Sequence, residues 1–434
     1  MAPITGSMTE LAAITHPLKI RDYRYFLLAR FCTTLAQNAL MIVIGWQAYT
    51  IARQDMSMQA ATAQLGLIGL AQFLPLFFLS PVSGWVADHY DRRHIGSVTT
   101  LLLIGFAATL AVATYEGWIG LPLIFTIAVG LGITRCFSQP AMGAMTGRLV
   151  PIESMPKAIA FSSVAWQTAT IVGPALGGVL YAFVPWAAYA MAVGLFMVGF
   201  VGLNLIKPVP PLDVDRTRHP LRQMVDGLVY VRTNKLVLGA ITLDLMAVWL
   251  AGATALLPVY ARDILHIGSG GLGSLAAAPG IGAALTAFWL GARPIENDVG
   301  NKMMIAVAIF GLATVVFGCT AFMPSGIGHM VAIGALFVCG IADMVSVFVR
   351  QSLIQIYTPD EMRGRVSSVS MLTISASNEL GEAESGFVAS LIGPVATVIG
   401  GGIGAIVVTL LWGRIFPQLG LARRFDMAKI EEEL

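Results

Sequence analysis

The chain has 434 residues, of which 56% are hydrophobic and only 12% are charged, and its formal net charge is +2. Soluble domains carry about 25% charged residues, so this composition excludes an ordinary soluble protein. The near-neutral charge gives no reason to expect a nucleic-acid partner.

The apolar residues gather into twelve stretches of about 20 residues or more, each long enough to cross a bilayer core of roughly 30 Å. This pattern predicts an all-α membrane protein with twelve transmembrane helices. The first run is too long for the core of a cleaved signal peptide. The predicted spans are 25–50, 64–86, 95–115, 119–143, 158–184, 186–206, 236–261, 270–292, 302–323, 328–350, 366–392 and 395–416.

Basic residues are sorted by side in this arrangement. Only Arg53 and Arg262 lie in loops on the side opposite the termini, and Arg30, Arg135 and Arg350 lie inside spans. All other Lys and Arg residues fall on the side of the termini. Because basic loops stay in the cytoplasm, we expect both termini there, in a multi-pass protein of a bacterial inner membrane.

A long cytoplasmic connection separates six spans from six. Its apolar residues recur at helical spacing and predict a short helix along the membrane surface: Leu221, Met224, Leu228 and Val231. The predicted domains are therefore a six-helix bundle, a linker with an amphipathic helix, and a second six-helix bundle with a cytoplasmic tail, at 1–206, 207–235 and 236–434.

The two halves also resemble each other at an offset of 208 residues. Segment 151–157 then lies over 359–365, and two glycine pairs coincide, Gly173 with Gly381 and Gly178 with Gly386. This indicates two pseudo-symmetric bundles repeated in the same orientation. The alternative is chance similarity between glycine-rich membrane helices.

The loop between spans two and three carries Gly84, Asp88, Arg92 and Arg93. A small residue at a helix end permits close packing, and the charges that follow can pair across the cytoplasmic surface. The pattern resembles the loop signature of the major facilitator superfamily, with His89 in place of a basic residue and Asp91 in place of a glycine. The resemblance implies a gating latch for the outward-facing state. The alternative is an ordinary positive-inside loop.

Span five contains Gly173, Pro174, Gly177 and Gly178. Small residues let helices approach closely, and a proline bends the axis. The stretch resembles the end of the antiporter motif of drug exporters in the same superfamily, although Ala169 stands where that motif has a further glycine. The resemblance favours export over generic packing.

Similarity to the superfamily extends from about residue 17 to 416. The patterns at 21–31, 88–93, 172–178 and 358–365 resemble the branch that holds the enterobactin exporter and the macrolide efflux pumps. This implies two bundles around a central cavity lined by spans one, four, seven and ten. It also implies proton-driven export of a siderophore or a bulky amphiphilic drug.

Polar residues inside spans are costly and so are candidates for function. All four spans implied to line the cavity carry them. Candidates for contact with substrate are Gln37, Asn38, Arg135, Gln139 and Glu384, and candidates for proton coupling are Asp244, Asp343, Glu379 and Glu382. Trp166 is a further substrate candidate, as a wall of a pocket for bulky apolar substrates. Arg30 and Arg350 are near cytoplasmic ends, where we expect anchoring or gate roles.

Asp343 is a specific candidate for coupling because it occupies the repeat position of Arg135. The two could face each other across the pseudo-twofold axis, and a change in that contact would alter the protonation of the carboxylate. The alternative is a static ion pair.

Span eleven holds three carboxylates. Glu379 and Glu382 share a helical face, while Glu384 points elsewhere. Like charges held close favour binding of a proton or a cation. The alternative is a stretch near the membrane surface whose carboxylates cap neighbouring helices.

Enzyme signatures and a Walker loop are absent from the sequence, and the six histidines show no ligand-like spacing. We therefore expect neither enzymatic activity nor a cofactor or metal. The expected partners are a small-molecule substrate, protons and the lipid bilayer, and the expected state is a monomer. The four cysteines lie in spans and should be free thiols.

The sequence thus favours a proton-coupled exporter, an antiporter working by alternating access. An importer of the same fold and a lysophospholipid flippase are alternatives. A non-transporting membrane receptor would be a different class, but it gives no reason for polar residues in four cavity helices.

Overall fold

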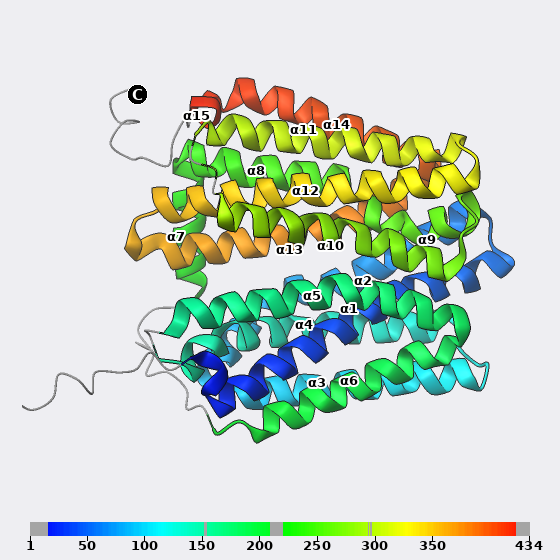
Figure 1. The fold of residues 1–434 in the computed structure, drawn as a ribbon, viewed down its shortest axis with the longest axis horizontal. Helices are drawn as coiled ribbons and strands as arrows, with labels where there is room; N and C mark the ends of the chain where they lie inside the picture. Colours follow the sequence, from blue (N-terminus) through cyan, green and yellow to red (C-terminus); the bar gives the residue numbers. More distant parts are fainter. Residues whose placement is uncertain (1–15, 152–153, 209–219, 294, 296, 422–434) are drawn as a thin grey trace, which may run out of the picture.

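The computed structural model describes residues 16–151, 154–208, 220–293, 295 and 297–421. This part of the chain is a bundle of long, roughly aligned helices (Figure 1). The long helices are α1 (Arg21–Asp55), α2 (Met58–His89), α3 (Arg92–Tyr115), α4 (Leu121–Leu149), α5 (Met155–Phe183), α6 (Pro185–Leu205), α8 (Lys235–Leu250), α10 (Gly268–Ala292), α11 (Val299–Cys319), α12 (Ser325–Tyr357), α13 (Asp360–Ile392) and α14 (Pro394–Ile415). The short elements are η1 (Pro17–Lys19), α7 (Pro220–Thr233), η3 (Ala253–Leu256), α9 (Leu257–Val259), η4 (Tyr260–Ile264), η5 (Thr320–Phe322) and α15 (Pro417–Leu421).

Eleven helical segments in the described part of the chain are long and apolar enough to span a membrane. The twelfth predicted span, 366–392, falls on α13, a helix of 33 residues, and this span carries three glutamates. It packs along α2 and against α8, among the other long helices. The helices therefore confirm the predicted twelve-helix membrane fold.

Several helices begin with a residue that satisfies or removes one of the free N–H groups of the first turn. The Ser57 side chain accepts a hydrogen bond from the Ala60 N–H (3.2 Å) at the start of α2. Asn234 does the same for Val237 (3.1 Å) at the start of α8. Proline, which lacks the N–H, stands in the first turn of α4, α5, α6 and α14.

The helices form two groups, α1–α6 and α8–α14 (Figure 1). In the first, α1 packs on α5 and α6, and α2 packs on α4; in the second, α10 and α11 pack on α12, and α11 packs on α14. Two long contacts join the groups, α5 along α10 and α2 along α13. The arrangement matches the predicted pair of six-helix bundles.

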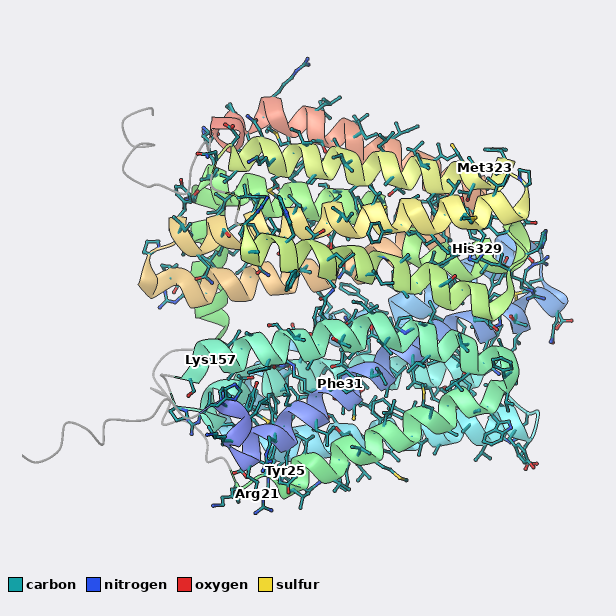
Figure 2. All side chains as sticks on the ribbon, viewed as in Figure 1. Arg21, Tyr25, Phe31, Lys157, Met323 and His329 are labelled. Atoms are coloured by element: carbon teal, nitrogen blue, oxygen red, sulfur yellow. The ribbon has the colours of Figure 1, made fainter. Side chains whose placement is uncertain are left out.

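We call the end at which α1 begins the inner end and the opposite end the outer end. Figure 2 shows Arg21 and Lys157 at the inner end, and Met323 and His329 at the outer end. The close glycine contacts between the two groups lie from the middle of the bundle to its outer end. A Cβ on Gly178 would lie 2.7 Å from the Ser269 carbonyl oxygen, and one on Gly386 would lie 2.5 Å from the Gly66 Cα.

The glycine pairs of the predicted repeat make equivalent contacts. Gly173 approaches α1, the first helix of its half, and Gly381 approaches α8, the first helix of the other half. Gly178 packs on α10, while Gly386 packs on α2, the second helix of the opposite half in each case. This equivalence supports the repeat over chance similarity.

The predicted continuous span 236–261 is wrong in one respect, because the helix is broken. α8 ends at Leu250, and the chain continues through η3 and α9 into η4, a π-helical turn closed by the Leu265 N–H and the Tyr260 carbonyl oxygen (2.7 Å). At the break, a Cβ on Gly252 would lie 2.9 Å from the Gly381 carbonyl oxygen. Broken membrane helices occur where the chain lines a site or a gate.

The predicted connector helix is α7. It packs against α13, where a Cβ on Gly227 would lie 2.8 Å from the Arg365 carbonyl oxygen. Arg365 and Asp226 form an ion pair (3.1 Å), and the Tyr230 hydroxyl donates to the Tyr357 carbonyl oxygen (2.7 Å). Of its predicted apolar stripe, Val231 is buried and Leu228 is exposed, while the side chains of Leu221 and Met224 lie outside the described residues.

Candidate functional site

A buried charge cluster joins α8 to α12. Asp244 accepts a hydrogen bond from the Ser346 hydroxyl (2.9 Å) and is ion-paired with Arg350. Asp244 and Arg350 are 5% and 2% exposed, so the pair is shielded from water. Asp343 lies half-buried on α12, close enough for the charges of both to act on it. We call these four residues the Asp244 cluster.

Helical spacing explains how α12 assembles its part of this cluster. Asp343, Ser346 and Arg350 follow one another at intervals of three and four residues, so all three lie on one helical face. That face meets α8 at Asp244. The predicted candidates Asp244 and Asp343 are thereby brought together.

The charges of the Asp244 cluster do not balance. Two carboxylates share one guanidinium, and burying an uncompensated charge is costly. The cluster can therefore take up one proton and keep the Asp244–Arg350 pair intact. This is the chemistry that a proton-coupling site needs.

The anchoring role expected for Arg350 is wrong, since its guanidinium is buried against Asp244 rather than reaching the membrane surface. The signal was present in the sequence as two opposite charges in spans seven and ten. The predicted contact between Asp343 and Arg135 stays a prediction. The charged neighbours that act on Asp343 in the structure are Asp244 and Arg350.

The polar candidates of α1, α4 and α5 differ in their surroundings. Asn38 is half-buried, and its amide donates to the Thr34 carbonyl oxygen of the same helix (2.9 Å). Gln37 and Arg135 are half-buried, while Gln139 and Trp166 are exposed. Their roles in binding a substrate stay predictions.

The carboxylates of α13 lie between two neighbouring helices. Gly381 packs on α8 and Gly386 packs on α2, which places Glu382 and Glu384 in the stretch between the two contacts. Both glutamates are half-buried. The Glu379 side chain lies outside the described residues, so its predicted role stays a prediction.

The loop motif between α2 and α3 caps helices in this structure. Arg92 donates to the Ala87 carbonyl oxygen (3.1 Å), and Arg93 donates to the Ile206 carbonyl oxygen at the end of α6 (2.7 Å). The close packing expected at Gly84 is absent, because a Cβ there would meet nothing within 4 Å among the described residues. The Asp88 side chain lies outside the described residues, so the predicted latch stays a prediction.

The predicted motif of span five forms two different contacts. Gly173 and Gly177 face α1, where added Cβ atoms would lie 2.7 Å from the Leu35 carbonyl oxygen and 2.8 Å from that of Ala39. Gly178 faces α10 of the other group instead. Pro174 lies inside the helix between them. The motif thus fixes α5 within its own bundle and also brings the bundles together.

A second charged cluster joins the two bundles at the outer end. Asp263, on the π-helical turn η4, accepts hydrogen bonds from the Tyr49 hydroxyl (2.5 Å) and from Arg53 Nε (2.8 Å) on α1. Arg262 donates to the Thr50 carbonyl oxygen (3.2 Å) and lies over the Tyr49 ring. We call Tyr49, Arg53, Arg262 and Asp263 the outer latch.

In the sequence, Arg53 and Arg262 indicate the sides of the membrane but predict no contact between them. Yet they are the two basic residues of the predicted outer loops, and Asp263 stands beside one of them. Tyr49 and Asp263 are separated by 214 positions, so their contact required the fold. The available signal was that these were the only two basic residues of the predicted outer loops, one of them next to Asp263.

Comparison with known proteins assigns a family. A family model described as Major Facilitator Superfamily matches residues 26–382. The enterobactin exporter EntS of Citrobacter koseri is 27% identical over 428 residues, covering 95% of this chain and 94% of that protein. The enterobactin exporter EntS of Shigella flexneri is 26% identical over 431 residues, with the same coverage.

Solved structures share the fold. A bacterial homolog to the human lysosomal transporter Spinster, in an inward-facing and unoccupied conformation, has a TM-score of 0.69 at 14% identity, covering 94% of this chain and 99% of that chain. The POT family transporter PepTSo has a TM-score of 0.72 at 12% identity, covering 93% and 99%. At such identities the likeness concerns the fold alone.

Proposed function

We propose that this chain, which belongs to the major facilitator superfamily, is a proton-coupled exporter of a siderophore or a bulky amphiphilic molecule. It would sit in the inner membrane of a bacterium as a monomer with both termini in the cytoplasm. Substrate and protons would cross in opposite directions by alternating access, as the two bundles, divided by the linker 207–235, rock against each other.

The Asp244 cluster is the observation that carries this proposal. A buried group of two carboxylates and one arginine is costly in a membrane helix, and such groups typically mark ion or substrate paths. Asp343, on which the charges of Asp244 and Arg350 act, is the proposed proton carrier. Glu379 and Glu382 on α13 are proposed as a second step of the proton path.

The contacts between the bundles support alternating access. The outer latch and the contact of Gly178 with α10 hold the outer end closed. In the proposed orientation, this outer-closed state would be the one that accepts a substrate from the inner, cytoplasmic side. The named activity of the relatives, export of enterobactin, supports a siderophore as substrate.

Flux measurements in proteoliposomes would test this proposal. We expect uptake of labelled enterobactin into everted vesicles when the lumen is acidic, and we expect proton release to accompany it. Asp343→Asn should abolish the response to the pH gradient while leaving exchange of substrate across the membrane intact.

Several outcomes would contradict the proposal. Flux that ignores the pH gradient would make the protein a facilitator, and binding without flux would make it a receptor. Movement of lysophospholipid in place of enterobactin would make it a flippase. A gradient response that survives in Asp343→Asn would remove Asp343 from the coupling path.

The outer latch gives a separate prediction about conformation. Asp263→Asn should open the outer end, because it removes the charge that binds Arg53. The pair is partly exposed, so we expect a shift of about fivefold in the population of open molecules. The measure is the distance between spin labels at Gln59 and Ser325, two exposed residues near the outer starts of α2 and α12.

The charge-swapped variant Arg53→Asp with Asp263→Arg is the matched control. It keeps opposite charges on the two bundles and should recover the short distance. An Asp263→Asn protein whose distance distribution equals that of the wild type would show that the pair does not hold the outer end closed.

A further inference from the structure

An apolar pocket of about 620 Å³ lies beside the outer latch. Its walls include Met58 from the start of α2, Ile264 from η4, Phe322 from η5, and Pro394, Gly400 and Ile403 from α14. The volume falls within the range of about 300–1,000 Å³ that is usual for ligand pockets. Neither the charge clusters nor the substrate candidates use it.

The position of the pocket points to the bilayer as the source of its occupant. α14 is one of the helices suited to span the membrane, and Ile403 and Phe322 are exposed on the outside of the bundle. Apolar side chains on that surface face lipid tails rather than water. Whatever fills the pocket in the membrane must therefore be apolar and arrive from the lipid phase.

The depth of the pocket fits one leaflet. It begins at Pro394, the first residue of α14, and reaches Ile403. Nine residues of helix rise about 14 Å, which is about half of the bilayer core of roughly 30 Å. At its outer rim, Arg53 Nη1 donates to the Met56 carbonyl oxygen (2.8 Å), two residues from Met58. The Arg53 guanidinium near this rim is ion-paired with Asp263.

We propose that this pocket binds an acyl chain of an outer-leaflet phospholipid and that the bound lipid stabilises the outer-closed state. Met58 belongs to one bundle and the other named wall residues belong to the second, so the complete pocket exists only when the bundles meet at the outer end. A ligand that binds one conformation better shifts the population toward it. The assignment to the outer leaflet rests on the membrane orientation in the proposed function. Binding of the lipid does not depend on transport.

Photocrosslinking in proteoliposomes tests the binding. The probe is phosphatidylethanolamine with a diazirine on one acyl chain, and crosslinked peptides are mapped by mass spectrometry. We expect crosslinks to concentrate on 392–403 and around Met58. Gly400→Phe should reduce them about tenfold, the effect of displacing about two buried methylene groups. A Cβ at Gly400 meets nothing within 4 Å, so the new side chain has room to enter the pocket.

Gly334→Phe is the matched control. Gly334 is also an exposed helical glycine of the second bundle whose Cβ would meet nothing within 4 Å, but it lies on α12 away from the pocket. Its crosslinking should equal that of the wild type. Crosslinks spread evenly over the lipid-facing helices, or an equal yield in both variants, would overturn the site.

The conformational part of the proposal has its own measurement. In mixed micelles, added phosphatidylethanolamine should increase the fraction of wild-type molecules with a short Gln59–Ser325 distance, and it should have no effect in Gly400→Phe. Equal distances at all lipid contents in the wild type would overturn the link between the lipid and the outer-closed state. Both measurements run without substrate or a proton gradient, so their failure is distinguishable from a failure of the proposed export.

Discussion

Replacing either member of the Asp244–Arg350 pair is expected to destabilise the protein by about 3–5 kcal/mol, because the remaining charge stays buried without its partner. Asp244→Asn leaves the Arg350 guanidinium uncompensated, and Arg350→Gln leaves two carboxylates without a cation. Both residues are almost fully buried, so water cannot screen the loss. The measurement is the thermal unfolding midpoint of the purified protein in detergent, alongside proton-coupled flux.

The double variant Asp244→Asn with Arg350→Gln is the control for this prediction. It removes both charges and leaves neutral groups that can still hydrogen-bond, so most of the stability should return. Flux should not return, because Asp343 then lacks the two neighbouring charges that act on it. Single variants that unfold at the wild-type temperature would show that the pair contributes nothing to the folded state.

Removing the Ser346 hydroxyl should destabilise the Asp244 cluster less than removing a charge. Its hydroxyl donates to Asp244 but carries no charge. Ser346→Ala should cost about 1 kcal/mol, the usual value of one hydrogen bond. The difference between this variant and Asp244→Asn separates the loss of a hydrogen bond from the loss of charge compensation.

The fold followed from the sequence because membrane helices are governed by local chemistry. A bilayer demands long apolar runs with internal hydrogen bonds, so hydropathy and the sorting of basic residues were enough to place the spans. The break after Leu250 was missed, since it depends on the contact between Gly252 and Gly381 in distant helices. The glutamates of α13 make it less apolar than the other spans. It could still be predicted as a span because its flanks are apolar and it resembles span five.

The charge clusters were predicted only in part, for a physical reason. Sequence gives the cost of each charge in a span, which identified Asp244 and Asp343, but it does not give the register between helices. Arg350 pairs with a residue 106 positions away, and Tyr49 with one 214 positions away. Such contacts are decided by helix packing, which brings α8 to α12 and the end of α1 to η4.

The two neighbouring glycines of α5 should respond differently to the same substitution. A Cβ on Gly177 would lie 2.8 Å from the Ala39 carbonyl oxygen of α1, inside one bundle. A Cβ on Gly178 would lie 2.7 Å from the Ser269 carbonyl oxygen of α10, across the two bundles. Both obstacles are backbone atoms, which cannot swing aside as a flexible side chain can.

We expect Gly177→Ala to lower the free energy of unfolding by about 1–3 kcal/mol, the cost of overpacking a core that has no alternative arrangement. Gly178→Ala faces a similar clash, but the bundles can separate and relieve it. Gly178→Ala should therefore destabilise only the outer-closed state. We expect the population with a long Gln59–Ser325 distance to rise about tenfold or more, and we expect export to be lost.

Gly194→Ala is the matched control for both variants, since a Cβ there meets nothing within 4 Å. It should change neither the unfolding midpoint nor the distance. If Gly178→Ala instead lowered the midpoint as Gly177→Ala does and left the distance unchanged, the α5–α10 contact would be a permanent part of the core. The bundles could not then separate at that point, and alternating access would need a different pair of helices to open the outer end.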